Sequence, residues 1–185
     1  MIDFVYESPN NLTHEFCNEM IRKFESDPRR APGRMLSGID QNVKDSTDLM
    51  IGRYAEWSEY TKVLDAKLQD AIQAYQTFLN KDLQIPVQFS KFTHLNHYQL
   101  QKSGKFEFHH DFAIQNGLFR VITFMWYLNT PDEGGETDFV YKKVKPEPGK
   151  LVLFPATWNL FHKGTEAKDR KSTRLNSSHS SVSRM

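Results

Sequence analysis

The residue pattern changes near position 86, and this change constrains the fold more than any other feature. Before it, apolar side chains recur at helical spacing in two segments, one from about residue 13 and one over 55–79. After it, short runs that alternate or are wholly apolar, such as 120–128 and 150–154, are separated by glycine and proline turns. Helices followed by short strands predict an α+β chain whose second half is a jelly-roll-like, double-stranded β-helix.

Individual elements follow from the same pattern. A turn is expected at Ser103–Gly104, because serine and glycine there interrupt two runs of strand-forming residues. Residues 31–55 look irregular, and Lys44-Asp-Ser-Thr-Asp48 within them fits a solvated polar turn. The predicted strands cover 2–6, 87–92, 96–101, 105–112, 120–128, 137–144 and 150–154.

Composition limits the class of protein. The 185 residues suit one domain with a sizeable core, and the formal net charge of +1 does not indicate nucleic-acid binding. The lone cysteine, Cys17, allows no internal disulfide, which suits a reducing compartment. Residues 1–7 lack the features of a signal peptide, and no apolar run reaches about 18 residues. We therefore expect a soluble, cytoplasmic protein without a membrane partner.

Three residues indicate a metal site. His109 and Asp111 are separated by one residue, and side chains at i and i+2 of a strand point to the same side, so both can reach one ion while His110 points away. His162, on a later strand, can complete the set. Two imidazoles and one carboxylate leave open positions on an octahedral Fe(II), which is typical of non-haem oxygenases, although zinc also accepts such ligands.

The segments around these ligands follow a recognisable order. Arg120-Val-Ile-Thr-Phe-Met-Trp-Tyr-Leu-Asn129 precedes Glu133-Gly-Gly-Glu-Thr-Asp-Phe139, and Lys145-Pro-Glu-Pro-Gly-Lys-Leu-Val-Leu-Phe-Pro155 comes next. Together with the ligand motifs, they resemble the catalytic domain of the prolyl 4-hydroxylase-like 2-oxoglutarate- and iron-dependent dioxygenases, especially the compact microbial and phage-type members. The resemblance extends over residues 44–164, and Lys44-Asp-Ser-Thr-Asp48 then resembles a segment near the mouth of the active site.

This resemblance implies a set of site residues. His109, Asp111 and His162 match the family's iron ligands and hence its catalytic centre. Tyr98 and Tyr127 match positions that bind 2-oxoglutarate, although either tyrosine fits equally well as packing inside the barrel. The implied cofactors are Fe(II), 2-oxoglutarate and O2, with ascorbate as an optional reductant.

The resemblance also implies the reaction, which is hydroxylation of an unactivated C–H bond. A prolyl residue in a peptide or protein is the favoured substrate, and free amino acids stay open because a fold does not fix a substrate. Arg120, Trp126 and Trp158 are candidate substrate contacts, with packing favoured for Trp126. The pattern does not define an oligomeric state.

The C-terminal residues depart from the family pattern. The family places a Lys or Arg about nine or ten positions after the distal histidine, where it pairs with the far carboxylate of 2-oxoglutarate. Here Asp169-Arg-Lys-Ser-Thr-Arg-Leu-Asn-Ser-Ser-His179 matches, codon for codon, the translation of a common sequencing-library adapter. Lys171 stands nine positions after His162, which we interpret as coincidence.

We therefore hypothesise a truncated chain with a read-through tail. The single dioxygenase domain would span 1–168, with helical support over 1–85 and the barrel core over 86–168. Residues 169–185 would be non-native and disordered, because they hold too few apolar side chains to bury a strand. The final strand and its basic anchor would then be missing, leaving a sheet edge unpaired and weakening cosubstrate binding.

Two other interpretations stay open. The first is a cupin-like metal-binding barrel without oxygenase activity, although cupins usually bring more histidines and the first motif here has no His-x-His. The second is an inactive fragment of the dioxygenase that retains only metal binding. Turnover of 2-oxoglutarate distinguishes both from an active enzyme.

Overall fold

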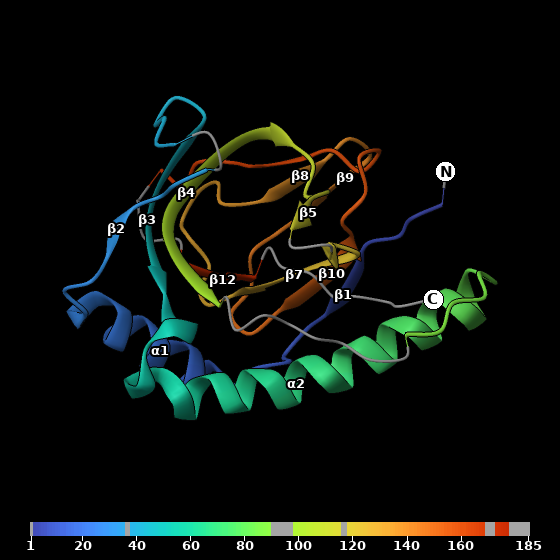
Figure 1. The fold of residues 1–185 in the computed structure, drawn as a ribbon, viewed down its shortest axis with the longest axis horizontal. Helices are drawn as coiled ribbons and strands as arrows, with labels where there is room; N and C mark the ends of the chain where they lie inside the picture. Colours follow the sequence, from blue (N-terminus) through green and yellow to red (C-terminus); the bar gives the residue numbers. More distant parts are fainter. Residues whose placement is uncertain (1, 36–37, 90–97, 116–117, 169–172, 178–185) are drawn as a thin grey trace.

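The computed structural model describes residues 2–35, 38–89, 98–115, 118–168 and 173–177. A curled antiparallel sheet of ten strands forms the body of the molecule, and two long helices lie along it (Figure 1). This is the double-stranded β-helix that the order of helices and strands predicts, so the expected fold class is confirmed. Within the described ranges, no helix has the length and apolar character needed to cross a membrane.

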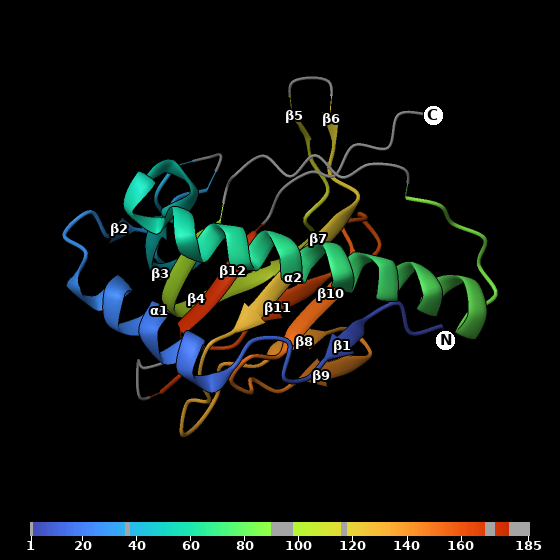
Figure 2. The ribbon, with the colours of Figure 1, turned by 90° about the horizontal axis from the view of Figure 1, so that it is seen from below.

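The two long helices form where apolar spacing predicts them. α1 (His14–Ser26) begins after Thr13, whose hydroxyl oxygen accepts a hydrogen bond from the Phe16 backbone N–H, as N-cap residues do. α2 (Ser58–Thr77) is the longer helix. Figure 2 shows both helices on the same face of the sheet. The shorter helical elements are η1 (Ile51–Arg53), η2 (Ala55–Trp57) and the π-helical turn η3 (Phe78–Asp82).

The strands pair in an antiparallel manner throughout. Their bounds are β1 (Tyr6–Ser8), β2 (Ala31–Pro32), β3 (Lys44–Met50), β4 (Gln99–His109), β5 (Ile114–Gln115), β6 (Leu118–Phe119), β7 (Ile122–Tyr127), β8 (Thr137–Phe139), β9 (Lys142–Val144), β10 (Leu151–Pro155), β11 (His162–Gly164) and β12 (Thr173–Ser177). The main sheet has the order β1-β10-β7-β12-β4-β11-β8-β9, with β3 paired to β4 and β2 to β3. β5 and β6 form a separate hairpin that projects from one end of the barrel (Figure 2).

β4 joins the two halves of the barrel. On one edge its first part pairs with β12, and its last part, Phe106 and His109, pairs with β11. Its other edge pairs with β3 along most of its length. The turn expected at Ser103–Gly104 is therefore wrong: β4 runs on through both residues, because Lys102 pairs with Thr47 and Lys105 with Asp45 on either side of them. A glycine in a strand also permits close approach of neighbouring backbones.

Two apolar clusters fill the molecule, one on each face of β7. Phe124 and Trp126 pack toward the helices, whereas Met125 and Tyr127 point into the barrel, because successive side chains of a strand alternate. The outer cluster, between helices and sheet, includes Met20, Phe24, Trp57, Leu64, Leu68, Tyr75, Leu100, Leu151 and Leu153. The inner cluster comprises Val5, Met125, Tyr127, Phe139, Val144, Val152, Phe154 and Leu160.

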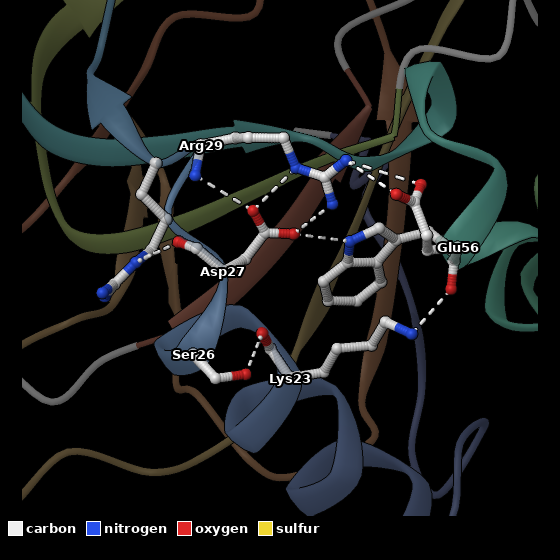
Figure 3. Close-up of polar contacts among 7 residues, drawn as sticks. Lys23, Ser26, Asp27, Arg29 and Glu56 are labelled. Carbon is white, nitrogen blue, oxygen red and sulfur yellow. Dashed lines mark hydrogen bonds and ion pairs between the residues drawn. The ribbon is translucent and has the colours of Figure 1, made fainter.

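A polar cluster fixes the end of α1 against the start of α2 (Figure 3). Arg29 donates from Nε and Nη2 to the two carboxylate oxygens of Asp27 at 2.8 and 2.6 Å, and the indole N–H of Trp57 donates to the same carboxylate at 3.1 Å. Nη1 of Arg29 also reaches Glu56 at 3.3 Å. The hydrogen bonds from Arg29 lower the pKa of Asp27 far below its ordinary value, against the opposing effect of burial.

The structure corrects four further expectations. The region 137–144 forms two strands, β8 and β9, joined as a hairpin, instead of one. Lys44-Asp-Ser-Thr-Asp48 belongs to the strand β3, which the pattern could not reveal because its buried side chains are polar. The first strand lies at Tyr6–Ser8, where it pairs with β10, and not at 2–6. Residues 87–89 are not a strand, and 90–97 lie outside the described residues.

The final strand of the barrel is not missing. Thr173–Ser177 forms β12 between β4 and β7, so the unpaired edge that we expected is filled. Leu175 reaches the outer cluster and is fully buried, while Arg174 points to the other side. A buried leucine at the right register, together with pairing on both edges, places the strand in the sheet. Lys171 and residues 178–185 lie outside the described residues, and the origin of the tail stays a prediction.

Candidate metal centre

The three predicted ligands come together at one end of the barrel. His109 is the last residue of β4 and His162 the first of β11, and the two are register partners. Asp111 lies two residues beyond the end of β4, not on the strand as the sequence predicted. The ladder stops there because β11 begins at His162 and offers no partner beyond it.

The ligand atoms have the spacing of a metal site. Nε2 of His162 lies 3.6 Å from Oδ2 of Asp111, and Nε2 of His109 lies 3.8 Å from Oδ1 of Asp111. One ligand atom from each of the three residues lies within 4.8 Å of the others. Two ligands of one ion, each at about 2.0–2.2 Å, are separated by at most about 4.4 Å. The distances from Asp111 to the two imidazoles lie below this limit, so these donors can share a single divalent ion.

Both imidazoles are oriented by backbone carbonyls. Nδ1 of His109 lies 2.7 Å from the carbonyl oxygen of Glu107, and Nδ1 of His162 lies 3.3 Å from that of Leu160. A carbonyl only accepts hydrogen bonds, so each Nδ1 carries the proton and each Nε2 keeps its lone pair. Such outer contacts fix the tautomer and the ring orientation that a metal requires.

Asp111 is held by one side chain of β7 and by another just before that strand. The hydroxyl of Thr123, in β7, donates to Oδ2 of Asp111 at 2.8 Å. Arg120 donates from Nη1 to the Asp111 backbone carbonyl at 3.0 Å and lies 3.9 Å from Oδ1. These contacts replace the strand pairing that the sequence predicted for Asp111. Sequence analysis missed Thr123, because a threonine in a buried strand gives no local signal of such a role.

Burial and mutual charge set the ionisation of the ligands. Burial, followed by the charge of His162, lowers the pKa of His109 from 6.5 to about 4. Burial pushes the pKa of Asp111 upward, but the charges of His162 and His109, the Thr123 hydroxyl and Arg120 outweigh it, so that pKa is lowered. At neutral pH, His109 is therefore neutral and Asp111 ionised, which are the forms that bind a metal.

Tyr127 and Tyr98 lie in different layers. Tyr127 points into the barrel, where its hydroxyl lies 2.6 Å from Oγ1 of Thr137, in the same inner cluster whose Phe139 and Phe154 flank the His162 ring. Tyr98 packs in the outer cluster, and its hydroxyl donates to Asp65 of α2 at 2.5 Å. The structure thus brings Tyr127 into the inner layer with the ligands and does not bring Tyr98 there. A cosubstrate role for either tyrosine stays a prediction.

Arg174 is a cation that the sequence analysis did not single out. It stands 12 positions after His162, beyond the spacing that the family pattern suggested. Its side chain is buried inside the barrel, with the guanidinium 5.9 Å from the Tyr127 ring and Nη2 donating to the carbonyls of Gly135 and Thr165 at 2.9 and 3.3 Å.

The surroundings of Arg174 fit an anionic ligand. Its Nε atom has no hydrogen-bond partner, and among the described residues no carboxylate lies within ion-pair distance. Burial lowers the pKa of Arg174, an effect that the nearby Tyr127 and Glu136 oppose. A buried guanidinium is costly unless an anion pairs with it. The barrel interior therefore offers a metal-binding end and a buried cation.

Aromatic side chains surround the mouth of the site. Trp158 is 64% exposed and meets Phe112 edge to face, with ring centroids 5.2 Å apart. Phe161 meets His110 in the same way at 5.5 Å. His110 therefore points away from the ligand set, as the sequence predicted. Trp126, in contrast, is fully buried and donates to Asn11 at 2.8 Å, so packing explains it.

Comparisons with known proteins agree with this architecture. Residues 93–178 match the family model described as the 2OG-Fe(II) oxygenase superfamily. No curated protein sequence matches the chain. The matched segment contains β4 through β12, and with them all three ligands. This segment, just under half of the chain, is thus similar to that superfamily, and its donor set fits the Fe(II) of the family's description.

Three solved structures of prolyl hydroxylases are similar to this chain in fold. The viral collagen prolyl hydroxylase of Paramecium Bursaria Chlorella virus-1, in its 2OG complex, has a TM-score of 0.58 at 19% identity, with 94% of each chain covered. A Trichoplax adhaerens prolyl hydroxylase, in complex with a hypoxia inducible factor peptide fragment, gives 0.67 at 15%, covering 93% of this chain and 81% of that one. A Pseudomonas putida prolyl-4-hydroxylase gives 0.60 at 14%, covering 98% and 93%. The fold is thus that of the prolyl hydroxylases, as the sequence predicted.

Proposed function

We propose that this chain is a 2-oxoglutarate- and Fe(II)-dependent dioxygenase that hydroxylates a prolyl residue of a peptide or protein. The observation that carries the proposal is the convergence of two Nε2 lone pairs and one ionised carboxylate at one end of the barrel. This ligand set leaves part of the coordination sphere open for cosubstrates. The family match over the same segment supports the dioxygenase class.

Each part of the site has a task in this reaction. His109, His162 and Asp111 would hold the iron, which supplies the chemistry of dioxygen activation when bound together with 2-oxoglutarate. Arg174 would pair with the far carboxylate of 2-oxoglutarate, because a buried guanidinium binds a carboxylate strongly. The aromatic rings that flank His162 exclude water from the inner side of the site.

The exposed aromatic rim supports a peptide substrate. Trp158 and Phe112 lie on loops next to the ligands, and Trp158 is largely exposed although tryptophan is usually buried. Extended proline-containing peptides dock on aromatic surfaces of this kind. The Trichoplax neighbour was solved with a peptide fragment, which is consistent with such a substrate class.

A turnover assay tests the proposal. The protein is incubated with Fe(II), ascorbate and 2-oxoglutarate, with and without proline-rich peptides, and succinate and hydroxyproline are measured. We expect succinate formation that increases with the peptide and hydroxylation of that peptide. Tight metal binding without any consumption of 2-oxoglutarate would instead identify a cupin-like metal-binding protein or an inactive fragment. Succinate without hydroxyproline would keep the dioxygenase and reject the prolyl substrate.

The tail requires a separate test. Residues 169–185 carry the adapter-like sequence, and Arg174 lies within it. Reading the gene beyond codon 168 shows whether the genomic frame continues with these codons or with others. If a different strand follows, the parent enzyme takes its anchoring cation from that strand, and we expect higher affinity for 2-oxoglutarate from the parent than from this chain.

A further inference from the structure

A phenyl ring lies flat against one of the proposed metal ligands. The centroids of the Phe106 and His109 rings are 3.6 Å apart, and their planes differ by 22°. His109 already has its Nδ1 fixed by the carbonyl of Glu107 at 2.7 Å. That hydrogen bond sets the orientation of the ring but still allows small rotations about the Cβ–Cγ bond. Contact with a flat neighbour removes this freedom.

An irregularity in β4 makes the stack possible. Phe106 and His109 are three residues apart, and in a regular strand such residues face opposite sides. Here Phe106 pairs with Gly164 and His109 with His162, so β4 uses one residue more than β11 over this stretch. The extra residue leaves Glu107 and Phe108 both exposed and turns Phe106 and His109 to the same side.

A buried polar network lies next to the phenyl ring. Lys44, the register partner of Phe106 on β3, holds its ammonium 5.9 Å from the ring centroid. Asp48 accepts from Lys44 at 2.7 Å and from the Ser46 hydroxyl at 2.7 Å, and it also accepts from Gln99. These partners fix the position of Lys44, since a satisfied buried network is rigid.

Strand β2 closes over this network. Gly33 lies so close that a Cβ there would overlap the Ser46 hydroxyl, and its N–H donates to the Ser46 carbonyl at 2.8 Å. Lys44, Ser46 and Asp48 are each less than a tenth exposed. The polar face of β3 is therefore closed beside Phe106, and its side chains bond to one another.

We propose that Phe106 is a positioning residue for the metal centre: its stacked ring fixes the plane of the His109 imidazole so that Nε2 points at the ion shared with Asp111 and His162. This inference rests on the proposed function. It assigns a role to the bulge in β4 and to the buried ion pair of β3, which is to hold a ligand in place before the metal binds. Loss of the stack should weaken metal binding and leave the fold intact.

The experiment compares Phe106→Leu with Phe106→Tyr and Phe108→Leu. Phe106→Leu keeps an apolar side chain and removes the flat ring, whereas Phe106→Tyr keeps the ring. Phe108→Leu makes the same change two residues away on the half-exposed face of the strand. Dissociation constants for Mn(II) and Co(II) are measured by calorimetry on the metal-free proteins, and thermal unfolding of the metal-free proteins reports on the fold.

We expect Phe106→Leu to bind both metals roughly tenfold more weakly, at the lower end of the effect of losing an outer-shell partner. Phe106→Tyr and Phe108→Leu should bind as the wild type does. Unchanged affinity in Phe106→Leu with intact unfolding would overturn the inference, and so would equal losses in Phe106→Leu and Phe108→Leu. If Phe106→Leu does not fold, weak binding by a folded Phe106→Tyr contradicts the inference. Absence of metal binding by the wild type would instead reject the proposed function.

Discussion

The two layers of this molecule, one on each face of β7, are built on different principles. The layer between the helices and the sheet is apolar throughout its buried cluster. The interior of the barrel places charged groups beside apolar ones, among them Arg174, His162 and the ion pair of Lys44 with Asp48. Buried charges cost stability, so they persist where a ligand or a defined geometry requires them. The outer layer therefore serves stability, and the inner layer serves binding.

The largest expected effect comes from removing a metal ligand, and the ligands belong to the inner layer. His109→Ala should abolish metal binding and turnover together, a loss greater than the roughly 10–100-fold that follows removal of an outer-shell partner. His110→Ala should leave the metal bound, because His110 points to Phe161 on the outside. Metal content after dialysis against a defined Fe(II) or Mn(II) concentration measures both. Equal loss in the two variants would show that the ligand assignment at this strand end is wrong.

An outer-layer variant should behave in the opposite way. Leu64→Ala removes a fully buried side chain of α2 and should lower the free energy of unfolding by about 3 kcal/mol, within the usual range for such truncations. Urea unfolding measures the change. The metal dissociation constant of the folded variant should stay within about twofold of the wild type, since Leu64 belongs to the outer cluster, whereas the rings that flank His162 belong to the inner one. A large loss of metal affinity would mean that the two layers are coupled.

Arg174→Met tests the inner layer without disturbing the ligands. Removing one partner of a buried charge pair costs about 2 kcal/mol or more, so affinity for 2-oxoglutarate should fall by roughly 30-fold or more. Replacing a buried charge by an apolar side chain often leaves stability unchanged or raised, so unfolding of the ligand-free protein should not be easier. Calorimetric titration with 2-oxoglutarate in the presence of Mn(II) is the measurement. Unchanged affinity would remove Arg174 from the cosubstrate site.

The smallest expected effect concerns the clamp between the two helices. Asp27→Asn should lower stability at neutral pH by about 1–2 kcal/mol, since it weakens charge-assisted hydrogen bonds to Arg29 and Trp57. The pKa of Asp27 is lowered in the folded protein from its ordinary value of 3.8. Its contribution to stability is therefore present above pH 3.8 and is lost as the pH falls below that value. Unfolding at pH 7 and in acid should therefore differ less for the variant than for the wild type. Parallel pH profiles would contradict this assignment.

The sequence predicts the outer layer better than the inner one. Apolar spacing predicts α1 and its cap at Thr13, because burial on one face leaves a regular pattern. The pattern did not predict β3, because its inward face is polar. The bonds among Lys44, Ser46 and Asp48 can be recognised only in the structure, where these side chains lie together. The ligand types and their order could be read from the chain.

The geometry around the ligands could not be read in this way. The end of β4 at His109 depends on where β11 begins, and the shared side of Phe106 and His109 depends on one extra residue in the pairing. The sequence did not single out Arg174 for a related reason. Its position inside the barrel follows from the register of β12 against β4 and β7 and not from its distance along the chain. Register is a property of two strands, which no single segment encodes.

The pairing of β4 with strands of both halves determines when the metal centre forms during folding. Hydrogen-bonded partners of this strand come from both sides of the fold, and its terminal residue is itself a ligand. Neither half of the barrel can present that ligand correctly while the other half is unfolded. Ion capture should accordingly be an all-or-none reporter of complete folding, and partially folded forms of this chain should leave iron in solution.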